Sequence, residues 1–217
     1  MIGAMTDPLW PLFDLRLAIG EIELRLPSDA EIAELCAVAR AGVHAPDEMP
    51  FAYPWTRKPS PRFEREFAQW HWKQRAAWDP AAWWLELAVF EAGRPIGSQA
   101  LAARQFAALR TVSTGSWLGL GRQGRGIGKA MRTSVLSLAF DGLDAEIAET
   151  EAFVDNRRSA GVSRALGYVS NGFGRLAPEG VAREAERFRL TRAAWQALPR
   201  PPVAIEGLAG CRELFGG

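Results

Sequence analysis

A glycine-rich stretch at residues 111–132, TVSTGSWLGLGRQGRGIGKAMR, constrains the fold of this chain more than any other segment. Its start is typical of a strand and its end of a helix, with glycines between them at positions 119, 121, 124, 126 and 128. Glycine leaves backbone N–H groups accessible, and a helix N-terminus favours negative charge. The stretch therefore predicts a strand, a phosphate-binding loop and a helix.

Two common phosphate-binding motifs fit this stretch poorly. A P-loop needs Ser or Thr after Gly-Lys, but Ala130 follows Lys129, so no hydroxyl is available for a magnesium ion. The dinucleotide pattern G-x-G-x-x-G occurs at 119–124, and Asp155 could serve as its acidic ribose ligand. That pattern normally occupies the first βα turn of an open sheet, whereas about half of this chain precedes it. A dinucleotide-binding protein remains an alternative.

A third motif, Q/R-x-x-G-x-G/A, is present as QGRGIG at 123–128. With it the sequence resembles the GNAT superfamily of acyl-CoA-dependent N-acyltransferases, in which this loop holds the pyrophosphate of coenzyme A. A second segment, VDNRRSAGVSRALGY at 154–168, resembles the RimJ/RimL-like branch of that family. The segments MPFAYPWTR, GSWLGL, FVDN, FRLTR and CRELFG are similar to an actinobacterial GNAT subgroup that includes a mycobacterial succinyltransferase.

The resemblance implies the GNAT fold, a mixed α/β (α+β) architecture with a mostly antiparallel central sheet and helices on both faces. In that fold the strands on either side of the CoA loop splay apart in a V. We expect one GNAT domain over residues 1–198, followed by a C-terminal tail, 199–217. Because the tail begins with a proline-rich break and then carries several apolar residues, we expect it to dock on its own subunit or on a partner.

Hydrophobic periodicity and turn residues predict the individual elements. Ser28 and Glu31 form a capping box that opens a helix ending at Gly42, and a proline-rich loop follows over 43–61. The remaining helices are predicted at 62–78, from 127 to about 142, at 157–166 and at 192–198. The strands are predicted at 13–19, 21–26, 83–91, 96–103, 109–120, 146–154, from 168 onward, and at 188–190.

The resemblance assigns CoA-binding roles by position. It implies that the last strand residues before the loop hold the pantetheine arm, that the loop takes the pyrophosphate, and that an Asn and a Ser after the next strand assist. The residues so assigned are Ser116, Trp117, Leu118, Gln123, Gly124, Arg125, Gly126, Ile127, Gly128, Lys129, Asn156 and Ser159.

The same resemblance suggests the catalytic groups. The Leu118 N–H is the expected oxyanion donor, because a fixed amide aimed at developing charge lowers the barrier. Many members place a Tyr acid seven residues after the Asn, but here Ser163 takes that position and is the candidate to protonate the thiolate. Glu149 is our candidate base. Other bases stay open: Glu151, Ser113, Thr114, His44, Tyr53 or a chain of water molecules.

The proline-rich loop is our candidate wall of the acceptor site, through Tyr53, Trp55 and Arg57. The donor is expected to be acetyl-CoA or succinyl-CoA, and Arg57 could bind a succinyl carboxylate. In the alternative, Arg57 only anchors the loop. The expected reaction is direct transfer to a primary amine, either a small molecule or a protein amino group. A CoA-binding sensor or scaffold without efficient turnover is the other function class.

Charge and cysteine content limit the partners and the location. The chain has 26 Lys plus Arg against 25 Asp plus Glu, a net charge of +1, so we expect no nucleic-acid or membrane binding. It has no long apolar run, and we expect a cytoplasmic location. Cys36 and Cys211 are too far apart in sequence for a disulfide framework or a metal cluster, so no metal is expected. We expect a homodimer.

Overall fold

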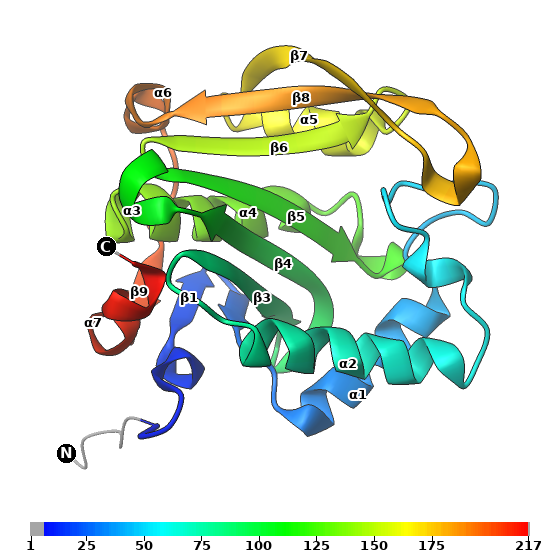
Figure 1. Ribbon diagram of the computed structural model, residues 1–217, viewed down its shortest axis with the longest axis horizontal. Helices are drawn as coiled ribbons and strands as arrows, with labels where there is room; N and C mark the ends of the chain where they lie inside the picture. The colour runs from blue at the N-terminus through cyan, green and yellow to red at the C-terminus, as the bar shows by residue number, and fades with distance from the viewer. Residues whose placement is uncertain (1–6, 217) are drawn as a thin grey trace.

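The computed structural model describes residues 7–216, which build one mixed sheet of nine strands between helices (Figure 1). The strand order is β7-β8-β6-β5-β4-β3-β2-β1-β9. Neighbouring strands are antiparallel except for β5 and β6, which are parallel. The strands are β1 Arg16–Ile19, β2 Ile22–Arg25, β3 Ala82–Glu91, β4 Arg94–Arg104, β5 Thr111–Leu118, β6 Ile147–Phe153, β7 Val169–Leu176, β8 Arg183–Thr191 and β9 Ala204–Glu206. A single parallel pair does not suit the open parallel sheet of the dinucleotide-binding alternative.

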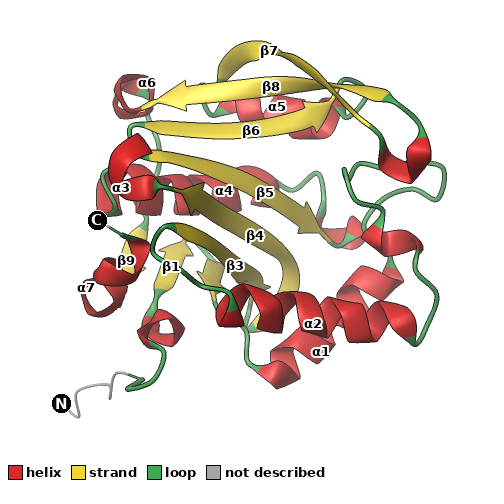
Figure 2. Cartoon of the chain, in the orientation of Figure 1, coloured by secondary structure: helices red, strands yellow, loops and turns green. Residues whose placement is uncertain are grey.

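Helices cover both faces of the sheet (Figure 2). On one face α1 (Asp29–Ala41) and α2 (Arg62–Ala76) share a core with β3. On the other, α4 (Ile127–Ser137) and its π-helical continuation Leu138–Gly142 pack on the larger core, with α5 (Arg157–Ala165) against β6. Three short helices complete the set: α3 (Phe106–Leu109), α6 (Arg192–Ala197) and α7 (Leu208–Cys211). The predicted GNAT architecture is confirmed.

The central strands diverge where the phosphate-binding loop was predicted. β5 and β6 pair only from Thr111–Ile147 to Ser113–Glu149, although β5 runs on to Leu118 and β6 to Phe153. At the vertex, the Thr150 hydroxyl donates to the Thr114 carbonyl at 3.1 Å. Figure 1 shows the two ribbons separating toward the end of β5. We call this diverging region the splay.

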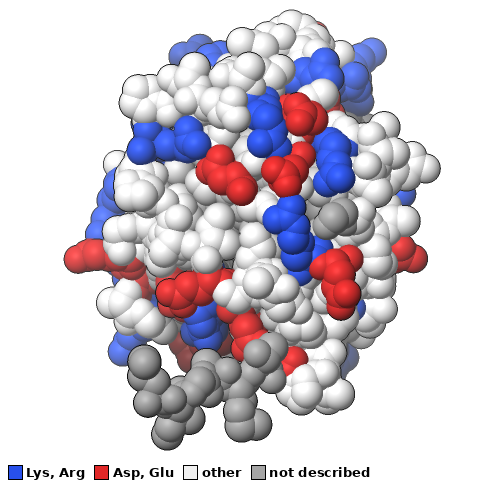
Figure 3. All heavy atoms as spheres, turned by 90° about the vertical axis from the view of Figure 1, so that its left-hand side faces the viewer, with Lys and Arg blue, Asp and Glu red and all other residues white. Residues whose placement is uncertain are grey.

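The C-terminal segment joins the same sheet. β9 pairs with β1, and the fully buried Phe215 packs against the rings of Trp78 and Trp83. Ion pairs join Arg212 to Asp144 and Arg200 to Asp141. On the face shown in Figure 3, basic and acidic side chains are interspersed, as the small net charge leads one to expect.

Several element boundaries differ from the sequence-based ones. The strand predicted at 109–120 is shorter, because Arg110 is left-handed after the short helix α3 and the strand begins only at Thr111. The strand predicted at 188–190 starts at Arg183; its first five residues hold four charged side chains and one Ala, so no apolar alternation marked them as a strand. The three-residue strand β9 was not predicted.

Candidate active site

The loop between β5 and α4 exposes a run of backbone donors. Gly124 and Gly126 have φ of 76° and 80°, a left-handed conformation that glycine adopts without strain. Gly126 caps α4, and the N–H groups of Lys129 and Ala130 both turn back to its carbonyl. From Gly124 to Gly128, no backbone N–H has a hydrogen-bond partner among residues 7–216. Such free donors at a helix N-terminus suit a pyrophosphate.

Side chains fasten this loop to its surroundings. The Gln123 amide donates to the carbonyls of Val43 and Leu118, at 2.8 and 2.9 Å, and accepts from Arg158 at 3.2 Å. The Arg125 guanidinium pairs with Glu91, so its charge is directed to the sheet rather than to the loop. The Gln123 side chain therefore shapes the loop. The backbone of the loop and the side chain of Lys129 are exposed.

The first residues of α4 differ in their contributions. Ile127 is buried in the larger core and contributes only its N–H to the loop surface. Gly128 lies within the first turn of α4, beside Val162 of α5. The loop therefore presents mainly backbone groups, and the packing of Ile127 and Gly128 against the core and α5 holds it in place.

Backbone polar groups of β5 face the splay on alternate residues. The Gly119 N–H donates to Ile96 of β4, so Leu118 points its N–H and C=O away from β4. Consistent with that, the Leu118 carbonyl accepts from Gln123 and the Thr114 carbonyl from Thr150 of β6. The Leu118 N–H therefore points toward the splay.

The end of β6 and the first turns of α5 form the opposite side of the splay. The Asn156 side chain caps α5, accepting from the Ser159 N–H at 3.1 Å, and both residues are half-buried. Ser163 is fully buried; its hydroxyl donates to the Ser159 carbonyl at 3.2 Å and accepts from Arg132 at 3.0 Å. Sequence-predicted residues of β5 and α5 therefore meet through Arg132, which also donates to the Ser116 hydroxyl at 3.2 Å.

On the face covered by α2, aromatic rings line the approach to β5. Trp55 of the proline-rich loop lies 5.6 Å from Trp117 and 5.1 Å from Phe51, measured between ring centroids. A Cβ at Gly115 would meet nothing within 4 Å, so β5 is open on one side beside Trp117. This opening lies on the face opposite α4, where an acceptor could approach.

The other two predicted acceptor residues are placed differently. Tyr53 is 61% exposed, and its hydroxyl accepts from Lys58. Arg57 donates to the carbonyls of Pro46 and Glu48 and pairs with Glu179 between β7 and β8. The structure thus engages Arg57 in holding the loop beside the β7–β8 connection.

The candidate bases do not converge on one point. The register places Glu149 beside Ser113 on the α2 face, half-buried, while the next acid on that face, Glu151, is exposed. His44 lies apart, with Nδ1 2.7 Å from the Ala45 carbonyl and Nε2 2.8 Å from the Thr56 hydroxyl. Since a carbonyl only accepts, Nδ1 carries the proton and a neutral His44 uses its Nε2 lone pair on Thr56.

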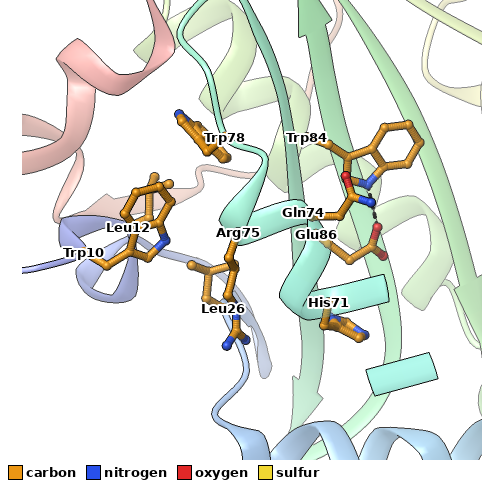
Figure 4. Close-up of a pocket in the computed structure, with 9 residues that line it drawn as sticks. All are labelled: Trp10, Leu12, Leu26, His71, Gln74, Arg75, Trp78, Trp84 and Glu86. Atoms are coloured by element: carbon orange, nitrogen blue, oxygen red, sulfur yellow. Dashed lines mark hydrogen bonds between the residues drawn. The ribbon is translucent and has the colours of Figure 1, made fainter. Parts of the chain in front are cut away.

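Two cavities lie on the α1–α2 side of the molecule. One, of ≈ 140 Å³, lies between the end of α1, His44, Thr56 and Phe63. The other, shown in Figure 4, has ≈ 10 Å³, about enough for one water molecule. It is lined by Trp10, Leu12, Leu26, His71, Gln74, Arg75, Trp78, Trp84 and Glu86. The second cavity is too small for an acceptor.

A buried polar group borders the smaller cavity. Trp84 and Trp70 donate their indole N–H groups to the Glu86 carboxylate (Figure 4 draws the bond from Trp84). Burial lowers the pKa of His71, and the nearby Glu86 opposes that shift. These side chains fix α2 on β3.

Sequence reasoning missed Arg132 and Arg158. Arg132 follows Gly128 by four residues and precedes the fully buried Val135 by three, so it lies on the inward stripe of α4. A charged residue on that stripe was a usable signal. Arg158 was visible as a basic residue in the first turn of α5, but its contact with Gln123 could not be inferred from spacing.

Residues 7–216 contain no cluster of His, Cys, Asp or Glu suited to a metal ion. Cys36 and Cys211 are both free and buried. In the same part of the chain, none of the helices has the length and apolarity needed to span a bilayer.

Comparisons with known proteins agree with this geometry. The family model "Acetyltransferase (GNAT) domain" matches residues 21–169. Mycobacterium smegmatis RimJ, solved in complex with CoA-disulfide, is 21% identical with a TM-score of 0.67, and the match covers 87% of this chain and 88% of that one.

Two further solved structures share the fold. Ribosomal-protein-S5-alanine acetyltransferase from Vibrio fischeri is 16% identical, with a TM-score of 0.61 over 83% of this chain and 98% of that one. The microcin C7 self-immunity acetyltransferase MccE, in complex with acetyl-CoA and AMP, is 17% identical, with a TM-score of 0.61 over 80% and 93%. The family match spans well over half of the sequence, so this chain belongs to the GNAT acetyltransferase family and is an acyl-CoA-dependent N-acyltransferase.

Proposed function

We propose that this protein transfers an acetyl or succinyl group from acyl-CoA to a primary amine by direct attack within a ternary complex. One observation carries the proposal: β5, which diverges from β6, leads into five consecutive backbone N–H groups, Gly124 to Gly128, that have no hydrogen-bond partner among residues 7–216. The loop would take the pyrophosphate, and the end of β5, Ser116 to Leu118, would hold the pantetheine arm as an added strand through the backbone groups that face the splay.

The chemistry then follows from position. A neutral amine entering past Trp55 and Trp117 attacks the thioester carbonyl, and its carbon–nitrogen bond forms as the oxygen becomes negative. The Leu118 N–H would stabilise that oxyanion. When the intermediate collapses, the carbon–sulfur bond breaks and its electron pair stays on the thiolate. Ser163 or a water molecule returns a proton to sulfur, while the amine loses one to Glu149 or to solvent.

The acyl donor and the amine acceptor are proposed from similar proteins and from the contacts of Arg57. The Vibrio fischeri ribosomal-protein-S5-alanine acetyltransferase is named for acetyl transfer to a ribosomal protein, which favours acetyl-CoA and a protein amino group. Succinyl-CoA stays in the proposal through the resemblance to the succinyltransferase subgroup. The carbonyl partners of Arg57 favour an anchoring role for that residue with either donor. We expect a cytoplasmic homodimer.

The direct test is thiol release from acetyl-CoA and succinyl-CoA with a panel of amines, including peptides with free N-termini. Release that depends on both donor and amine supports direct transfer, and mass spectrometry of the product identifies the acyl group. A covalent acyl-enzyme formed without an amine would contradict the ternary mechanism.

One observation favours a second candidate, a CoA-binding sensor. The hydroxyl proton of Ser163 is committed to the Ser159 carbonyl, and the residue is fully buried. A protein that binds CoA but releases no thiol with any amine would fit that alternative.

A further inference from the structure

Arg132 is a buried cation between β5 and α5, on either side of the splay. Its side chain starts from the second turn of α4 and is 4% exposed. Nη1 donates to Ser163 on α5 at 3.0 Å, and Nη2 donates to Ser116 on β5 at 3.2 Å. One guanidinium therefore joins the two elements that flank the expected thioester position.

No acid balances this charge. Among residues 7–216, no carboxylate lies within salt-bridge distance of Arg132. Burial lowers its pKa, and the phenol of Tyr168 is the one ionisable group whose charge acts on it. Among the same residues, its buried Nε has no hydrogen-bond partner. Burying a lone cation costs folding free energy, because water is lost and no anion replaces it.

The chemistry beside Arg132 would supply the missing anion. Acyl transfer first places negative charge on the carbonyl oxygen and then on sulfur, both within the splay. A fixed cation in a water-poor site stabilises such charge without reorganising during the reaction. Since the two serines that it holds belong to β5 and α5, on either side of the splay, its charge and its hydrogen bonds act between these two elements.

We propose that Arg132 is a positioning residue for acyl transfer: it fixes Ser163 and Ser116 across the splay and favours the thiolate that leaves. The inference rests on the proposed function. Arg132 keeps its protons throughout, and the proton that sulfur receives comes from Ser163 or water and is replaced from solvent. The residue lowers the free energy of the anionic state through Ser163 and does not itself contact the substrate.

The kinetic test compares Arg132→Met and Arg132→Lys with the wild type. We expect kcat with acetyl-CoA to fall roughly 10- to 100-fold in Arg132→Met, and less in Arg132→Lys, which keeps the charge. The KM for acetyl-CoA should change less than about 3-fold, because the loop is intact. Ser134→Ala is the matched control on α4: Ser134 is buried, bonds only within its own helix and should leave kcat unchanged.

A double-variant cycle separates positioning from general structural damage. If Arg132 acts through Ser163, the Arg132→Met/Ser163→Ala enzyme should lose much less than the product of the two single losses. Full multiplicativity, or a kcat of Arg132→Met close to that of the wild type, would overturn the proposal. A loss confined to succinyl-CoA would also overturn it, because that pattern would mean that Arg132 binds the acyl carboxylate.

A binding measurement needs no turnover. The affinity of CoA relative to desulfo-CoA should rise from about pH 7 to about pH 10 in the wild type, since the cation favours the thiolate. The rise should flatten in Arg132→Met; if that variant does not fold, Arg132→Lys should show a smaller change. An identical rise in wild type and variant contradicts the inference. A wild type that binds CoA but releases no thiol contradicts the proposed function alone.

Discussion

Among single residues, Gly126 has a backbone conformation on which the shape of the predicted CoA loop depends. Its φ of 80° is strained for any residue with a Cβ, although that Cβ would meet nothing within 4 Å. We therefore expect Gly126→Ala to weaken CoA binding about tenfold, because relief of the strain turns the N–H groups away from one another. Gly121→Ala is the matched control, since Gly121 has ordinary φ and equal space. Titration calorimetry with CoA measures both, and equal losses would contradict the role of Gly126.

The two thiols give a second residue-scale prediction. Burial raises the pKa of Cys211 to about 11 and also raises the pKa of Cys36. Because the thiolate is the reactive form, both should resist iodoacetamide at pH 8 in the folded protein and react once it is unfolded. Mass spectrometry of alkylated peptides checks this. Rapid labelling of Cys211 in the native protein would show that its surroundings open.

At the scale of an element, the start of α1 depends on one ion pair. Arg25 bonds to Glu31 and, together with the Ser28 cap, lowers the Glu31 pKa from 4.5 to about 2. A depressed folded-state pKa gives stability that is present above pH 4.5 and lost as the pH falls from 4.5 toward 2. We expect Glu31→Gln to cost about 1 kcal/mol at pH 7, discounted for solvent screening, and almost nothing near pH 2.

Urea unfolding at several pH values measures this dependence. Glutamine still completes the capping box, so the change isolates the charge. Glu34→Gln on the same helix is the control: Glu34 is exposed, so this substitution should leave the free energy of unfolding unchanged at every pH. A Glu31→Gln penalty that does not shrink in acid would mean that the carboxylate acts by packing.

Local chemistry explains which elements could be predicted from the sequence. The capping box of α1 and the glycine loop each depend on residues that are close together in the sequence, and the structure contains both. β9 has only three residues after a proline break, and its pairing with β1 joins chain ends that no local pattern relates. The contacts of Arg132 have the same origin, since Ser116 and Ser163 are 16 and 31 residues away. Local signals thus predicted elements and the loop, whereas contacts across the fold required the structure.

At the scale of the whole molecule, the C-terminal segment is expected to be part of the folding unit. Phe215 is fully buried, and Trp78 and Trp83 donate their indole N–H groups to the carbonyls of Leu214 and Phe215. We expect Phe215→Ala to destabilise the protein by about 3–5 kcal/mol, as large buried aromatic truncations do. Leu214→Ala, at a half-buried position, should cost clearly less. Chemical unfolding that shows a loss below about 1 kcal/mol for Phe215→Ala would make the tail an independent appendage.

Ligand-dependent stability tests the whole molecule as a CoA-binding protein. A ligand at about 100 times its Kd stabilises the folded state by about 2.7 kcal/mol, which for a chain of this size raises Tm by about 5–10 °C. We expect such shifts with CoA, acetyl-CoA and succinyl-CoA, and none with NADH. If succinyl-CoA gives an extra shift that Arg57→Ala removes, Arg57 binds the acyl carboxylate. If the extra shift remains in Arg57→Ala, Arg57 only anchors the loop through its bonds to the backbone carbonyls. If no CoA species stabilises the protein, the N–H groups of Gly124 to Gly128, which have no hydrogen-bond partner in the described part of the chain, do not bind a pyrophosphate.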